Sequence, residues 1–155
     1  MLNIKRALAA ISVAMTLSIP GSAIAATRDV QKEEANRKLV LDFYDRVFNK
    51  HDIENGVKVM AERYKQHNPN VPNGKQPFAS FFSDLFKKNP DLRARVVHVA
   101  ADGDLVWLHV HITTNAQDRG QAVVDIFCVE NGQIIEHWDV LQPVPEKSVN
   151  GNPMF

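Results

Sequence analysis

The sequence reads Leu105-Val-Trp-Leu-His-Val-His-Ile-Thr-Thr114 and then, after a polar break, Gln121-Ala-Val-Val-Asp-Ile-Phe-Cys-Val129. Both stretches are rich in β-branched and aromatic residues and are bounded by turn-forming residues, so they predict a β-hairpin. Because side chains alternate between the two faces of a strand, Trp107, His109 and His111 share one face of the first strand. This hairpin decides how the rest of the chain is interpreted.

Asp125 is the one carboxylate among the apolar residues of the second strand, and it shares a face with Val123, Phe127 and Val129. With a turn centred near residues 117–118, His111 is expected to lie opposite or diagonal to Asp125. A carboxylate flanked by apolar residues and facing an imidazole is the arrangement in this sequence that most resembles a catalytic site.

The first 25 residues have the pattern of a secretory signal peptide. Lys5 and Arg6 precede an apolar run over residues 7–19, and the small residues of Ala23-Ile24-Ala25 form a cleavage site. The apolar run is short for a membrane span. We therefore expect cleavage near Ala25, export to the periplasm or outside the cell, and no membrane attachment afterwards.

The remaining residues, 26–155, are enough for one domain and too few for two. Cleavage removes two positive charges and no negative ones, which takes the formal net charge from zero to about −2. Because no basic run is present, nucleic acid is not an expected partner.

Other periodic segments complete the expected fold. Apolar residues at helical spacing predict a helix over residues 39–48, a weaker one from residue 52 to about 64, and a third over 75–88. Alternating patterns predict further strands over residues 91–101 and 133–142. The order is typical of an α+β domain in which three N-terminal helices pack on a curved antiparallel β-meander.

The expected sheet leaves two questions open. A type I′ turn at Asn131-Gly132 places Trp138 opposite Asp125, whereas a slip of one residue presents His137 and Asp139 instead. The second face of the sheet, which carries Val106, Leu108, Val110 and Ile112 with Val124, Ile126 and Cys128, is also apolar. We expect a homodimer partner to cover this outer face.

Three helices on a curved meander, the stretch Tyr64-Lys-Gln-His67-Asn68-Pro69 and the stretch from Glu130 to Gln142 together resemble the SnoaL-like polyketide cyclase family. That family belongs to the nuclear-transport-factor-like superfamily of cone-shaped, cystatin-like α+β barrels, which also contains ketosteroid isomerase. The resemblance covers residues 36–142. It implies one SnoaL-like domain over residues 26–155.

The resemblance also implies roles for individual residues. Asp125 corresponds to a strand aspartate that acts as acid and base, and His111 to its histidine partner fourteen residues earlier. His109 is expected in the pocket, and His67 with Asn68 matches the ligand-proximal loop. Apolar neighbours (Trp107, Phe127 and Trp138) are expected to desolvate Asp125 and raise its pKa. The implied chemistry is an aldol condensation, cyclisation or isomerisation of a small hydrophobic carbonyl compound, without cofactor or metal.

Two alternatives stay open. In the first, the domain only binds a small hydrophobic ligand in the periplasm, because this fold carries many functions. Export favours that alternative, since polyketide cyclases work beside cytoplasmic synthases. In the second, His109 and His111 bind zinc together with Asp125 or His67.

Overall fold

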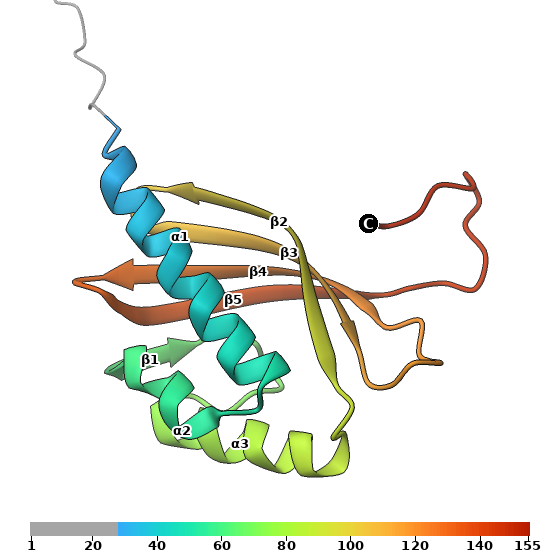
Figure 1. Cartoon of the computed structure of the whole chain (residues 1–155), viewed down its shortest axis with the longest axis horizontal. Coiled ribbons are helices and arrows are strands. Elements are labelled where there is room, and N and C mark those ends of the chain that lie inside the picture. The colour runs from blue at the N-terminus through green and yellow to red at the C-terminus, as the bar shows by residue number, and fades with distance from the viewer. Residues whose placement is uncertain (1–27) are drawn as a thin grey trace, which may run out of the picture.

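The computed structural model describes residues 28–155, so the predicted signal peptide lies outside the described residues. Helices and strands follow one another along the chain as in Figure 1. The elements are α1 (Val30–Tyr44, continued by a π-helical turn, Asp45–Asn49), α2 (Ile53–Gly56, followed by a 3₁₀ turn, Val57–Val59), β1 (Met60–Gln66), α3 (Lys75–Lys88), β2 (Arg93–Asp102), β3 (Leu105–Thr113), β4 (Gln121–Glu130) and β5 (Gln133–Pro143).

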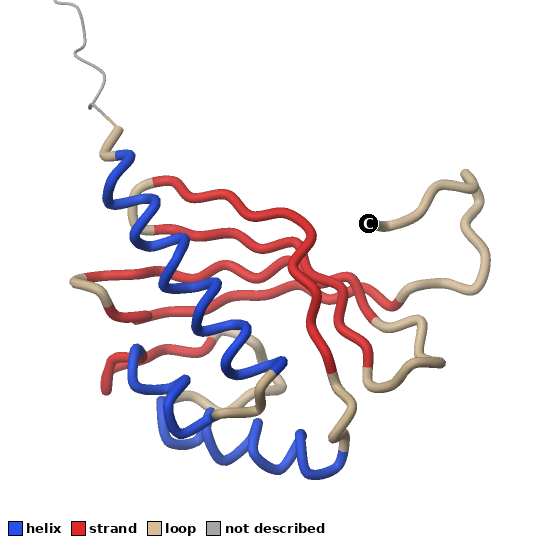
Figure 2. Tube along the Cα trace, viewed as in Figure 1, coloured by secondary structure: helices blue, strands red, loops and turns tan. Residues whose placement is uncertain are grey.

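One mixed sheet, with strand order β1-β5-β4-β3-β2, carries the helices on its concave face. Neighbouring strands are antiparallel except β1 and β5, which are parallel. Figure 2 shows α1 crossing the curled sheet while the long β2 bends towards α3, so the helices close a cone. The expected α+β class is confirmed. Within the described residues, no helix is both long and apolar enough to cross a membrane.

The edge strand β1 differs from the expected second helix. Asp52 caps α2 by accepting a hydrogen bond from the backbone N–H of Asn55, but α2 ends after one turn. The chain then becomes extended, and it buries Met60, Ala61 and Tyr64 against the helices. Pairing with β5 satisfies backbone groups at both ends of this segment and, with the burial, outweighs its weak helical pattern.

The register of β3 and β4 reverses the expected assignment of faces. Leu108 pairs with Asp125, and His111 pairs with Ala122, so His111 and Asp125 lie on opposite faces of the sheet. Val106, Leu108 and Val110 are fully buried under the helices. This register buries the purely aliphatic set and leaves His109 and His111 half-buried on the outer face. The outer face therefore carries Trp107, His109, His111, Val124, Ile126, Cys128, Trp138 and Val140.

A β-bulge in β5 decides which residues face Asp125. The type I′ pairing of Glu130 with Gln133 is present, as predicted, and Asn131 adopts a positive φ of 51°. Val129 then pairs with Ile134, but Cys128 pairs with Glu136, so Ile135 is an extra residue in β5. The bulge turns Trp138 outward and sets Asp139 opposite Asp125. The first of the two registers considered from the sequence, with Trp138 opposite Asp125, is wrong.

The C-terminal tail returns to the outer face of the sheet. The Phe155 ring stacks on the His111 ring at a centroid distance of 4.2 Å and lies 5.4 Å from the His109 ring. The guanidinium of Arg95 lies 5.8 Å from the centre of the Phe155 ring. The apolar end of the chain is therefore docked on the domain by aromatic and cation–π contacts.

Candidate functional site

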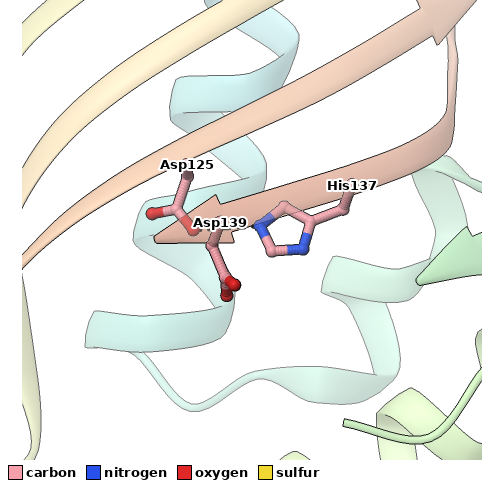
Figure 3. A group of neighbouring side chains, drawn as sticks. All are labelled: Asp125, His137 and Asp139. Carbon is pink, nitrogen blue, oxygen red and sulfur yellow. Dashed lines mark hydrogen bonds and ion pairs between the residues drawn. The ribbon is translucent and has the colours of Figure 1, made fainter. Parts of the chain in front are cut away.

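A cavity of about 640 Å³ lies between the concave face of the sheet, α1 and α3. Aromatic side chains from α1 and α3 line one part of its wall. Phe43 lies 5.7 Å from Phe127 in an edge-to-face contact, and Phe78 lies 4.4 Å from Phe82. The polar side chains Asp125, His137 and Asp139 project from the sheet into the same space (Figure 3). This combination of an apolar wall and a few convergent polar groups is typical of small-molecule sites.

Asp125 is 5% exposed and is bonded through both carboxylate oxygens. The Tyr44 hydroxyl donates to Oδ2 at 2.8 Å, and Nε2 of His137 lies 2.9 Å from Oδ1. Burial, followed by the negative charge of Asp125, raises the pKa of Tyr44 well above its usual range. Tyr44 therefore stays protonated and acts as a fixed donor to Asp125 at neutral pH.

Gln66 fixes a hydrogen on one ring nitrogen of His137. Its Oε1 accepts the backbone N–H of Asn68 at 3.0 Å, which fixes the orientation of the amide. The same oxygen lies 2.9 Å from Nδ1 of His137, so Nδ1 must carry a hydrogen. A single proton is then shared across the contact between Nε2 and Asp125. The pair exists either as imidazolium and carboxylate or as neutral imidazole and carboxylic acid.

Asp139 adds a second carboxylate beside this pair. Nδ2 of Asn68 donates to its two oxygens at 2.8 and 2.7 Å. Ligand atoms of Asp125, His137 and Asp139 lie within 4.8 Å of one another, which makes this group the metal-binding candidate among residues 28–155. Two carboxylates and one imidazole are a donor set that zinc accepts. In the structure, His137 and Asp125 instead satisfy each other by a hydrogen bond.

The predicted site residues divide between the two faces of the sheet. Asp125, Asn68 and Phe127 line the cavity, as expected. The others do not line it. The ring of His67 stacks on Trp138 at 4.6 Å, and Nδ1 of His109 lies 3.1 Å from Nδ1 of His98. Trp107 lies on the outer face, and Nε2 of His111 lies 2.8 Å from the Arg119 carbonyl oxygen. The expected pairing of His111 with Asp125 is wrong, and so is the zinc set of His109 and His111 with Asp125.

Among the cavity residues that were not predicted as site residues, four polar ones belong to the hydrogen-bonded group around Asp125. Tyr44 falls in the apolar stripe of the first helix and looks like core, and Gln66 follows a segment read as helical. His137 and Asp139 appear only in the alternative register of the last strand. Two features of the sequence could have indicated these residues. A tyrosine in an apolar helical stripe needs a hydrogen-bond partner for its hydroxyl, and His137 and Asp139 alternate along one strand, so they share a face.

Comparison with known proteins shows the family to which this domain belongs. Residues 40–137, well over half of the chain, match the family described as the SnoaL-like domain. No protein of curated function matches the sequence significantly.

Solved structures of similar fold share little sequence with the chain. A SnoaL-like protein from Burkholderia thailandensis is 14% identical, with a TM-score of 0.62 over 71% of this chain and 96% of its own. A candidate ketosteroid isomerase from Kribbella flavida is 18% identical, with a TM-score of 0.62 over 76% and 84%. A candidate polyketide cyclase from Acidithiobacillus ferrooxidans is 17% identical, with a TM-score of 0.59 over 69% and 87%. These similarities show the fold.

Proposed function

The chain belongs to the SnoaL-like domain family, and we propose that it catalyses acid–base chemistry on a small, mainly apolar carbonyl compound in its cavity. The observation that carries this proposal is the buried Asp125–His137 pair, which lines an aromatic cavity and shares one proton. Buried polar groups of this kind are costly unless they are paired, and a shared proton between two titratable groups suits proton transfer. The reaction class is aldol condensation, cyclisation or double-bond isomerisation, and no cofactor is required.

In this mechanism Asp125 acts as the base. Each carboxylate oxygen has two lone pairs, so Asp125 keeps its bonds to Tyr44 and His137 while it takes a proton from the carbon next to the carbonyl. In the imidazolium–carboxylate form of the pair, His137, held by Gln66, places a positive charge beside the negative charge that develops on the enolate. Asp139 stabilises the imidazolium by its own negative charge. Asp125 then returns the proton to another carbon, which completes an isomerisation.

A non-catalytic binding domain is the second candidate. It is favoured by the same hydrogen bonds, because an aspartate with both oxygens already bonded also serves as a purely structural carboxylate. Native mass spectrometry of the protein isolated from its own source separates the two. A retained ligand with a carbonyl group and acidic C–H bonds supports catalysis. A retained lipid or hydrocarbon without such bonds supports the binding domain.

Export and dimerisation are further parts of the proposal. We propose that residues 1–25 direct export and are removed, which N-terminal sequencing of the purified protein tests directly. We also propose a homodimer through the outer sheet face, which exposes Val124 (38%) and Val140 (66%). Sedimentation of a Val140→Glu variant tests this interface, because a buried glutamate disfavours association.

A further inference from the structure

The cavity is asymmetric in charge along its length. Asp125 and Asp139 lie at its inner end on the sheet, whereas Arg119 lies on the loop between β3 and β4. Within the described residues, Arg119 is the one lysine or arginine that lines the cavity. The inner end holds two carboxylates and one imidazole, so a fixed anionic group on a ligand is placed more favourably at the loop.

The loop holds Arg119 in a fixed position. The Arg119 carbonyl oxygen is 2.8 Å from Nε2 of His111, and its Nε donates to the carbonyl of Val144 at 3.3 Å. The Val144 N–H donates in turn to the carbonyl of Gly120 at 3.0 Å. Gly120 has a φ of 76°, and a Cβ there would lie 2.1 Å from the carbonyl oxygen of Ile112, so only glycine fits. His111, expected in the catalytic pair, instead stabilises this loop through its contact with the Arg119 carbonyl oxygen.

Asp118, the neighbouring acid, is held by neutral donors and does not form an ion pair with Arg119. Its Oδ1 accepts the backbone N–H of Gly120 at 2.8 Å, and its Oδ2 accepts the backbone N–H and the hydroxyl of Thr114 at 2.8 and 2.9 Å. These hydrogen bonds, first that from the Thr114 N–H, lower the pKa of Asp118. Among residues 28–155, no carboxylate lies within ion-pair distance of the Arg119 guanidinium. Its terminal nitrogens are available to a ligand.

We propose that the ligand is an elongated, mainly apolar anion whose carboxylate or similar oxyanion binds Arg119 while its carbonyl group lies at Asp125 and His137. This inference rests on the proposed function and names its substrate class. Gln121, at the start of β4, and Asp125 are separated by about 14 Å at the usual rise of a strand. The aromatic wall between them contacts the apolar body, and a guanidinium suits an oxyanion because it donates two parallel hydrogen bonds.

Two fluorescent probes of nearly equal shape test this assignment. Anilinonaphthalene sulfonate carries an oxyanion, and phenylnaphthylamine is the same aromatic scaffold without it. Arg119→Gln is expected to weaken binding of the sulfonate by about fivefold, as for a partly exposed charged contact, and to change binding of the neutral probe by less than about twofold. Arg119→Lys retains the charge and should retain most of the preference. Arg37→Gln, which removes a surface arginine on α1, is the matched control.

The inference is overturned if Arg119→Gln leaves sulfonate binding unchanged, or if it weakens both probes equally. Failure of this inference is distinguishable from failure of the proposed function. Loss of catalysis in Asp125→Asn together with an unchanged sulfonate preference in Arg119→Gln removes the anion-binding role and leaves the acid–base function intact. The reverse pattern removes the catalysis and leaves an anion-binding cavity.

Discussion

Asp125 and His137 are hydrogen-bonded across neighbouring strands, with 2.9 Å between Oδ1 and Nε2, although their strands are not in simple register. The extra residue Ile135 shifts β5 by one position, so that His137 and Asp139 both face the cavity. A single bulge therefore assembles the candidate site and moves Trp138 to the outside.

Gln66→Leu tests how His137 is oriented. The variant removes the oxygen that accepts the Nδ1 hydrogen, so Nδ1 is no longer required to carry one. We expect the ¹⁵N resonance of Nδ1 to move towards that of an unprotonated nitrogen and turnover to fall by about tenfold, as for other supporting residues of this kind. Gln142→Leu on the exposed end of β5 is the control. An unchanged Nδ1 resonance in Gln66→Leu would rule out this positioning role.

The two tyrosines of the chain provide a pH test. Burial raises the pKa of both Tyr44 and Tyr64 above the usual value, and the charges of Asp125 and Asp139 add to the effect. In the unfolded chain each tyrosine ionises near pH 10, whereas in the folded protein it stays neutral to higher pH. The free energy of unfolding is therefore unaffected below about pH 10 and falls above it by about 1.4 kcal/mol per pH unit for each tyrosine.

Alkaline titration checks this expectation by the tyrosinate absorbance. The absorbance should stay absent above pH 10 until the protein unfolds, and Tyr44→Phe should make stability less dependent on pH in that range. Two tyrosinates appearing in the folded protein with a midpoint near pH 10 would show that these hydroxyls are exposed.

A pair of identical substitutions tests the faces of the sheet. Val110 is fully buried on the concave face, whereas Val124 is 38% exposed on the outer face. Val110→Ala should lower the free energy of unfolding by about 2–3 kcal/mol, and Val124→Ala by less than about 1 kcal/mol. Urea unfolding of dilute protein measures both. Equal losses would contradict the register of β3 and β4.

The sequence predicted the class of fold and part of the site. Helical spacing located α3 and the second half of the first helical segment, which in the structure begins nine residues earlier, at Val30, and the turn at Asn131-Gly132 was identified from its residues alone. Asp125, Asn68 and Phe127 were correctly placed at a cavity. These features depend on local patterns, which a sequence shows directly.

The remaining features depend on contacts between distant segments. In the pairing of β3 with β4, residues on the same face of the sheet are separated by an odd number of positions along the chain. His111 and Asp125 are separated by an even number of positions, so they lie on opposite faces. Asp125 faces the cavity, and His109 and His111 therefore face outward. The bulge at Ile135 has no signal in composition, because an isoleucine is equally suited to a regular strand. Tyr44 has the sequence pattern of a core residue, and its role depends on the contact of its hydroxyl with Asp125, which lies far away in the sequence.

The exchange of α-hydrogens for deuterium in a carbonyl ligand tests the central claim most directly, because it detects proton removal without any later step. Wild-type protein should catalyse this exchange, and Asp125→Asn should slow it by at least about a hundredfold. The control His109→Gln, on the outer face, should exchange at the wild-type rate. Equal exchange by wild type and Asp125→Asn would contradict the account and leave the domain as a binding protein.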